Sequence, residues 1–415
     1  MAPIPRGPRQ LPPELVADIL DSFVESAPSH AARTPNLAAF ARVSRDWHDA
    51  ATPLLYRDIY LDSKTRQGIL GAMEGNEALA PLVRKLTLSG GNLTAPDFAR
   101  MQAVLERCDA VTSLAYHCFD EEFAEDLTFF ISSTWPTLQY LRADQSQNLY
   151  NFLSRLPKLE TLVARYIEFP EPSAWVASPP PTPPTSGRSS PASSYFSDDS
   201  HGSTGPARPT FRLKRFDSGT SPLSANFQLL TSSSQASLRS LDVPISSLIS
   251  QDLSGFSSLE TLTLTLAERY LPVPEPDRPR AHGARDEARC LRRVRRLLRG
   301  IKESQVPLRR LEVYEPAYSS TKAFDADVFE SERMLEAVPP SVEVLDLATI
   351  AVRADYLARA FAHVDVNEDL RVKVYSNCLG VRELILPSTV ARSAGSAIGP
   401  MLATLYQRNV SITWV

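Results

Sequence analysis

The stretch LETLTL, at residues 259–264, carries the pattern that decides the fold. It runs as an apolar residue, two mostly polar residues, a second apolar residue, any residue and a third apolar residue. Ten copies of this phrase occur along the chain, which is too many for coincidence. They are VRKLTL (83–88), VTSLAY (111–116), LQYLRA (138–143), LETLVA (159–164), LKRFDS (213–218), LRSLDV (238–243), LETLTL (259–264), LRRLEV (308–313), VEVLDL (342–347) and VRELIL (381–386).

The spacing of the copies predicts one structural unit per copy. The first four starts are 28, 27 and 21 residues apart (83 to 111, 111 to 138, 138 to 159), and this phrase at a period of about 20–29 residues resembles the leucine-rich repeat. That resemblance implies short parallel strands whose inward leucines stack on those of the next copy, burying a core that no single repeat could bury. Longer gaps, 54 residues from 159 to 213 and 49 from 259 to 308, indicate one unit plus an insertion.

Helical patterns lie between the phrases. Phe98, Met101, Val104 and Leu105 have helical spacing, as do apolar residues within 123–131 and 356–361. We therefore predict an α/β fold: an irregular solenoid over 61–415, with parallel strands on its concave side and helices on its convex side.

The apolar spacing near the N-terminus predicts a separate helical module over residues 11–60. We expect residues 1–10, before it, to be flexible. An apolar stripe at helical spacing is formed by Leu11, Leu15, Ile19 and Leu20. Pro12 and Pro13 lie in the first turn, where proline is tolerated. A second helix is expected over 37–47, after an irregular loop, and Pro53 is expected to allow a turn or a new start. About forty residues bury too little surface to be stable alone.

This module resembles the F-box family, in the form that fungal members combine with leucine-rich repeats. The matching pattern is Leu-Pro-x-Glu-Leu, an Ile-Leu pair, Val-x-Arg/Ser-x-x-Trp and a Pro-Leu-Leu-Tyr close. The matching residues are Leu11, Pro12, Glu14, Leu15, Ile19, Leu20, Val43, Ser44, Arg45, Trp47, Pro53, Leu54, Leu55 and Tyr56. The resemblance implies docking on a Skp-type adaptor through Leu11, Pro12, Leu15, Ile19, Leu20, Val43, Trp47, Leu54, Leu55 and Tyr56. An ordinary helical cap on the apolar end of the solenoid is the alternative interpretation.

Composition sets wide limits on partners and compartment. The chain has 44 Lys and Arg against 48 Asp and Glu, a formal charge of −4, so no global field predicts binding to nucleic acid. No apolar run approaches the ~18 residues of a membrane span, and the N-terminus lacks a signal-peptide core. The four cysteines are far apart, which suits reduced thiols and predicts neither a disulfide nor a zinc site. We expect a protein of the cytoplasm, the nucleus or both, and nothing in the sequence predicts a homo-oligomer.

Residues 177–209 consist mostly of Pro, Ser, Thr and Gly. Such a segment has too little apolar surface to offset the entropy cost of ordering, so we predict a disordered insert. Candidate phosphorylation sites within it precede proline or aspartate: Ser178, Thr182, Ser190 and Ser197. A tolerated loop insertion without function is the alternative, because lengthening a flexible loop costs little.

A second insertion, 272–302, begins as a proline-rich loop and continues as a basic amphipathic helix. Its apolar face has Ala288, Leu291, Val294, Leu298 and Ile301. One hypothesis is a binding patch for an acidic partner, a calmodulin-like groove or a membrane surface. The candidate residues for an acidic partner are Arg289, Arg292, Arg293, Arg296 and Arg299. A repeat helix with its apolar face on the core and solvated arginines outside is the other.

The search for catalytic residues identifies none. No glycine-rich phosphate loop is present, and His117 beside Cys118 is the one close Cys/His pair, without a recognisable third group. Cys108 lies at the end of a helical pattern and Cys378 lies just before a strand phrase. Both positions are typical of small apolar core residues. Four tyrosines lie within or just after strand phrases: Tyr116, Tyr140, Tyr166 and Tyr314. Two positions are open for each of them, on the concave surface or packed at the end of a strand. We expect no cofactor and no metal.

The function implied by the resemblance is a non-catalytic substrate receptor of a Skp-cullin-F-box ubiquitin ligase, whose repeats bind an unknown protein. Two alternatives remain. One is a repeat scaffold that binds partners without any ligase, and the other is an F-box protein with a non-degradative role. The sequence does not identify the bound protein.

Overall fold

The computed structural model describes residues 11–27, 29–144, 153–165, 210–219, 230–248, 253–266, 282–314, 333–350, 352–362, 378, 380–393 and 395–415. Contacts divide the chain into two compact units. The first unit is Met1–Gln145 with Lys158–Val163, and the second unit is Ser146–Pro157 with Ala164–Val415.

The first unit begins with a helical module of three helices, α1 (Pro13–Ser26), α2 (His30–Phe40) and α3 (Arg45–Arg57). Its core contains Val16, Leu20, Leu37 and Ala51, each at most 1% exposed. The rings of Phe23 and Phe40 meet edge to face on this core, with centroids 5.5 Å apart. Three helices therefore share one small apolar centre.

The predicted second helix is in fact two helices. The chain leaves α2 at Ala41, and Ser44 adopts an extended conformation whose hydroxyl accepts a hydrogen bond from Trp47 N, which starts α3. The irregular loop expected before residue 37 is not observed either, because α1 runs to Ser26 and α2 starts at His30. Pro53 neither ends nor starts a helix: it lies inside α3 and is exposed, where water can solvate the carbonyl left without its helical donor.

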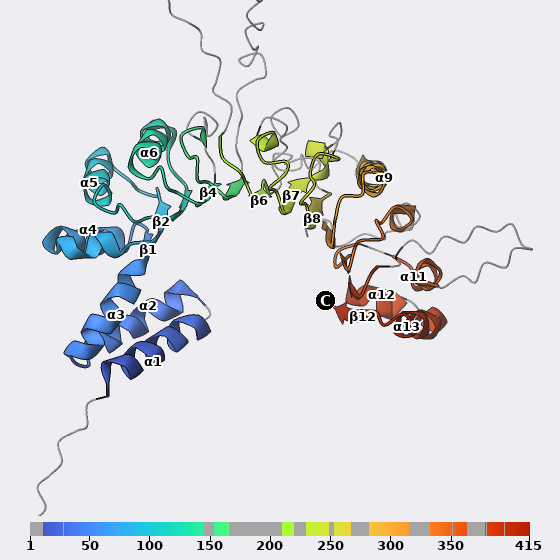
Figure 1. The fold of residues 1–415 in the computed structure, drawn as a ribbon, viewed down its shortest axis with the longest axis horizontal. Helices are drawn as coiled ribbons and strands as arrows, with labels where there is room; N and C mark the ends of the chain where they lie inside the picture. Colours follow the sequence, from blue (N-terminus) through green and yellow to red (C-terminus); the bar gives the residue numbers. More distant parts are fainter. Residues whose placement is uncertain are drawn as a thin grey trace, which may run out of the picture. The chain divides into compact units, whose positions relative to one another are not determined.

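The sheet of the first unit starts directly after α3. Strands β1 (Asp58–Leu61), β2 (Lys85–Ser89), β3 (Ser113–His117) and β4 (Tyr140–Asp144) pair in parallel and in sequence order. The start of β5 (Thr161–Arg165) follows β4 through two hydrogen bonds to Gln139 O. Helices α4 (Arg66–Gly75), α5 (Ala95–Leu105) and α6 (Glu121–Thr134) lie on one side of these strands (Figure 1), and the 3-10 helix η1 (Glu77–Leu82) leads into β2.

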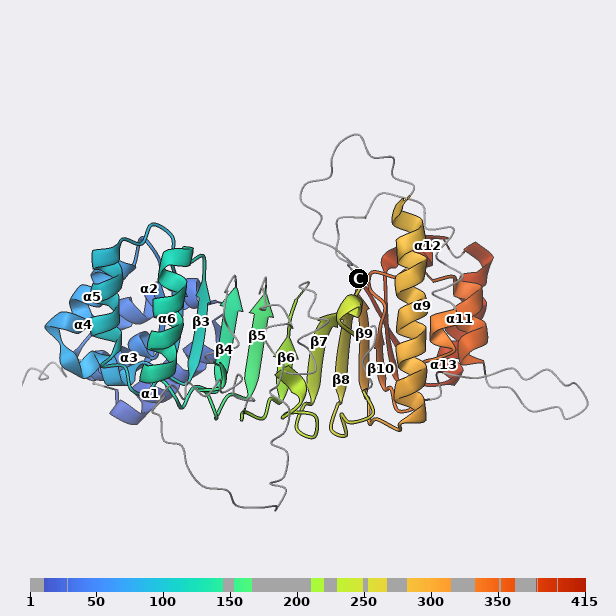
Figure 2. The same cartoon turned by 90° about the horizontal axis from the view of Figure 1, so that it is seen from above.

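The second unit repeats this arrangement. Strands β6 (Arg215–Asp217), β7 (Ser240–Pro244), β8 (Thr261–Thr265), β9 (Arg310–Tyr314), β10 (Val344–Asp346), β11 (Glu383–Leu386) and β12 (Ser411–Trp414) pair in parallel. Their connections include α9 (His282–Glu303), α11 (Ala354–Phe361) and α13 (Ile398–Gln407), on one side of the strands (Figure 2). Shorter elements are η3 (Ile245–Leu248), α12 (Ser388–Ser393) and η5 (Gly395–Ala397).

A row of apolar side chains, most of them leucines, runs across the strands of each unit. Parallel registers place Leu86, Leu114 and Leu141 side by side in the first unit. In the second unit the corresponding row is Phe216, Leu241, Leu262, Leu311, Leu345, Leu384 and Ile412. The leucines of these rows are at most 1% exposed, and full burial of such a side chain stabilises by about 1.5–3 kcal/mol. The stacking predicted from the phrase is therefore confirmed.

The ten phrases contain strands β2 to β11, one strand in each. The helical patterns at 98–105, 123–131 and 356–361 are α5, α6 and α11. Strands β1 and β12 were not predicted. β1 extends the sheet into the stretch assigned to the helical module, so the boundary at residue 60 falls inside a strand. Predicted segments 1–10 and 177–209, Tyr166 and the proline-rich loop before α9 lie outside the described residues.

Candidate docking surfaces

The predicted adaptor-binding residues divide into two groups in the structure. Four of them have large exposed apolar side chains: Leu11 (44%), Leu15 (48%), Ile19 (44%) and Val43 (63%). Pro12 is exposed at the start of α1. The others pack inward, with Leu20 fully buried in the module core and Trp47, Leu54 and Leu55 partly buried against it, while Tyr56 is partly buried.

Helix α1 consequently has apolar residues on two faces. Val16 and Leu20 point into the module core, whereas Leu15 and Ile19, four residues apart and so on one face, point to solvent. Val43 lies in the turn between α2 and α3, where its backbone N–H donates to Phe40 O. Exposed apolar side chains grouped on one helix are typical of a protein-binding surface.

An ion pair and a hydrogen bond join helix α2 of the helical module to strand β1. Arg33 of α2 forms an ion pair with Asp58 at the start of β1, 2.7 Å between Nη2 and Oδ2, and both side chains are largely covered. His30 Nε2 donates to Asp58 O at 2.7 Å. Because α3 also continues directly into β1, the apolar face of α1 is carried on a defined scaffold.

The face of the first sheet that the helices leave uncovered is lined by alternate residues of each strand. Lys85, Ser113 and Tyr140 form one row across the sheet, and Thr87, Ala115 and Arg142 form the next. A hollow of about 480 Å³ opens over these two rows. Tyr116, by contrast, is 3% exposed and faces the helices, so of its two predicted positions the packed one is confirmed.

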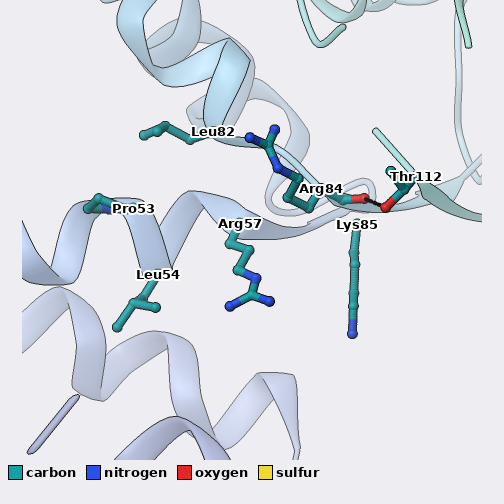
Figure 3. A pocket seen from close by; sticks show the side chains of 7 residues that line it. All are labelled: Pro53, Leu54, Arg57, Leu82, Arg84, Lys85 and Thr112. Atoms are coloured by element: carbon teal, nitrogen blue, oxygen red, sulfur yellow. Dashed lines mark hydrogen bonds between the residues drawn. The ribbon is translucent and has the colours of Figure 1, made fainter. Parts of the chain in front are cut away.

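A second hollow of about 420 Å³ lies where α3, η1 and β2 meet (Figure 3). We call it the basic hollow, because three of its seven lining residues are cations and none is a carboxylate. Its residues are Pro53, Leu54, Arg57, Leu82, Arg84, Lys85 and Thr112. Lys85 and Thr112 also line the first hollow. The sequence interpretation included Leu54 as an adaptor contact but did not identify the three cations.

The uncovered face of the second sheet has a different lining. Asp217, Asp242, Glu312 and Asp346 occupy one register row with Thr263 between them. Asp217 Oδ1 accepts a hydrogen bond from Gly219 N at 2.8 Å, and Arg310 Nη2 lies 3.5 Å from Asp346 Oδ2. The residues of this row all hold the fifth position of their phrases, so an alignment of the ten copies predicts the row.

The basic amphipathic helix is α9, and it packs as a repeat helix. Leu291, Val294, Leu298 and Ile301 are at most 2% exposed. Of the predicted acidic-partner residues, Arg292, Arg296 and Arg299 are exposed and Arg293 is half-buried. The side chain of Arg289, like that of Ala288, lies outside the described residues. The prediction of a repeat helix whose apolar face packs on the core is therefore confirmed. The exposed arginines form a basic surface that a partner can reach.

Two of the described cysteines, Cys108 and Cys378, lie in buried environments that disfavour the thiolate. Burial raises the pKa of the Cys108 thiol to about 12 and that of Cys378 to about 12, which disfavours the reactive thiolate. The prediction that both are small core residues is confirmed. Cys118 is exposed next to His117, whose ring stacks on Tyr60 with centroids 6.4 Å apart. Within the described part of the chain, no group of three or more His, Cys, Asp or Glu side chains is suited to hold a metal.

The candidate phosphorylation sites Ser178, Thr182, Ser190 and Ser197 all lie outside the described residues. None of the helices within the described ranges is long and apolar enough to span a membrane.

No protein-family model matches this chain. No curated protein matches it either. Among solved structures, the chain is similar to the leucine-rich repeat-containing protein LegL7 from Legionella pneumophila, with 12% sequence identity and a TM-score of 0.38 over 80% of this chain and 83% of that chain. The leucine-rich-repeat architecture itself follows from the ten phrases and the parallel registers of their strands.

Proposed function

We propose that this protein is an F-box substrate receptor. The helical module docks on a Skp-type adaptor and through it on a cullin ligase, while the repeats bind the protein to be ubiquitinated. The proposal places the protein in the cytoplasm, the nucleus or both.

The observation that carries the proposal is the second apolar face of α1. Leu15 and Ile19 are nearly half exposed although Val16 and Leu20 already supply the module with its core. A cap whose only role was to close the apolar end of the sheet would not need this outward face. The residues on it also occupy the Leu-Pro-x-Glu-Leu and Ile-Leu positions through which the chain resembles the F-box.

In this function the protein performs no bond chemistry. A receptor accelerates ubiquitin transfer by holding a substrate lysine close to a thioester formed elsewhere, which raises its effective concentration. The raised thiol pKa of Cys108 and Cys378 is compatible with such a non-catalytic role. A repeat scaffold without any ligase is the alternative, and the uncovered faces of both sheets would serve it equally well.

The test is capture of a purified Skp-type adaptor and cullin by the full-length protein. We expect wild type to capture both, and Leu15→Glu with Ile19→Glu to weaken adaptor binding by about 100-fold or more, because two charges would be buried at the centre of an apolar contact. The matched control is Leu402→Glu with Tyr406→Glu, the same change on the exposed apolar residues of α13, which should leave capture intact.

Failure of the wild-type protein to capture the adaptor would contradict the receptor function and favour the scaffold. Capture that survives the double change in α1 would show that the docking surface lies elsewhere. If adaptor capture holds, a bound protein whose lifetime lengthens on removal of this receptor separates a degradative from a non-degradative role.

A further inference from the structure

The basic hollow combines three cations with apolar walls. Arg57 lies at the end of α3, and Arg84 and Lys85 lie at the start of β2. The backbone joins them, since Arg84 N donates to Arg57 O at 2.9 Å. Pro53, Leu54 and Leu82 supply the apolar lining.

The charges around this hollow are not balanced by neighbouring acids. Asp58, the one carboxylate of the adjoining hollow, is already paired with Arg33 at 2.7 Å. Arg142, the other cation there, is paired with Asp144 at 2.8 Å. Within the described ranges, Arg57, Arg84 and Lys85 form no ion pair, so the three cations that line the hollow have no carboxylate partner among the described residues.

Ordinary structural roles explain part of this cluster. A cation at the end of a helix interacts favourably with the helix dipole, which accounts for Arg57. Arg84 Nη1 donates to Pro81 O at 2.7 Å, closing the end of η1. Neither role applies to Lys85, which is exposed on the uncovered face of β2 and lines both hollows.

The arrangement of the cations indicates the shape of the ligand. Arg57 and Lys85 point in the same direction, whereas Arg84 carries its guanidinium away from them (Figure 3). A single phosphate group is best held by donors that converge on one point. Cations spread along a hollow with apolar walls instead suit an extended segment with several carboxylates and an apolar side chain.

We propose that the basic hollow binds an acidic, Asp- or Glu-rich segment of the protein that the repeats recruit. The segment lies across Lys85, with its carboxylates toward Arg57 and Lys85 and an apolar side chain against Leu54 and Leu82. This inference rests on the proposed function and adds to it the chemical class of the bound protein. Electrostatic complementarity of this kind gives specificity and speeds encounter.

The test uses the full-length protein and a fluorescently labelled ten-residue peptide with four aspartates and a central leucine. The matched peptide has asparagine in place of each aspartate. We expect the acidic peptide to bind, and Arg57→Glu with Lys85→Glu to weaken binding by about tenfold, since each exposed charge contact contributes a factor of about two to five. Lys158→Glu, an exposed lysine of the same unit outside the hollow, should leave affinity unchanged.

Several outcomes would overturn the inference: no binding of the acidic peptide to wild type, equal binding of the asparagine peptide, or equal losses in the Lys158→Glu control. Tighter binding of a peptide with one phosphoserine and no aspartate would replace the proposed carboxylate ligand with a phosphorylated one. The thermal melt of each variant shows whether it is folded.

Adaptor capture by the same preparations separates the two proposals. Peptide binding without adaptor capture would leave the basic hollow in place and reject the receptor function. Adaptor capture without peptide binding would do the reverse. Loss of adaptor capture in Arg57→Glu with Lys85→Glu would assign the hollow to the adaptor and overturn the proposed ligand.

Discussion

Helices α1 and α9 are both amphipathic, yet they use their apolar residues differently. In α9, Leu298 is fully buried and the outward residues are arginines. In α1, the buried residues Val16 and Leu20 are accompanied by Leu15 and Ile19, which are 48% and 44% exposed. An apolar pattern alone therefore does not separate a helix that completes a core from one that also displays an apolar surface.

The physical difference lies in what each helix packs against. α9 covers a sheet, and a single stripe of leucine and valine is enough to complete that core. α1 belongs to a three-helix module whose centre is filled by a few side chains and the Phe23–Phe40 ring contact. Leu15 and Ile19 lie outside this centre and stay exposed. The leftover surface is available to a partner.

The largest expected effect is on stability. Leu298→Ala removes a fully buried side chain and should lower the free energy of unfolding by about 2–5 kcal/mol. Leu15→Ala removes a half-exposed one and should change it by less than about 0.5 kcal/mol. Urea denaturation of both variants measures the difference. Equal losses would show that the outward face of α1 is covered within the chain itself.

Cysteine labelling compares the accessibility of the outward face of α1 with that of the buried face of α9. A cysteine introduced as Ile19→Cys should react with a maleimide as fast as the native, exposed Cys118. The native Cys290, on the buried side of α9, should react at least about tenfold more slowly, because it becomes accessible only when the structure opens. Mass spectrometry of labelled peptides gives both rates in one sample. Rapid labelling of Cys290 would contradict the packed position of α9.

The smallest expected effect comes from the outward arginines of α9. Replacing Arg292, Arg296 and Arg299 by glutamate should shift the melting temperature by no more than about 2–4 °C, since these side chains are exposed. Differential scanning calorimetry measures the shift. A large loss of stability would mean that these arginines hold the core together. Retention on an immobilised acidic polymer should fall in the same variant if the basic face binds acidic partners.

The repeat architecture could be predicted from sequence because one phrase carries both the strand and its inward leucine. The stretch YRDIYL at 56–61 also fits the phrase and contains β1, but it overlaps the Pro-Leu-Leu-Tyr close of the helical module. β12 offers only the alternation of Val410, Ile412 and Trp414, which falls short of the phrase.

The sequence predicted a helical module over residues 11–60, but it did not predict where one helix ends and the next begins. Residues 37–47 have helical spacing throughout, and the break at Ser44 depends on one hydroxyl that accepts from Trp47 N. Local periodicity does not report such a cap when apolar residues continue across it. For the same reason the exposure of Val43 and the burial of Leu20 could not be assigned from the stripe.

The basic hollow could not be predicted, because it forms where α3, η1 and β2 meet in space. Arg57 and Lys85 are 28 residues apart in sequence (57 to 85). Only the register that pairs Asp58 with Lys85 places them together.

The most direct measurement is hydrogen–deuterium exchange of the full-length protein with and without a purified Skp-type adaptor. We expect the adaptor to slow exchange in residues 11–26 and in the turn around Val43, and to leave exchange in strands β6 to β12 unchanged. Slowed exchange confined to the repeats, or no change at saturating adaptor, would contradict the claim that the outward face of α1 is the docking surface.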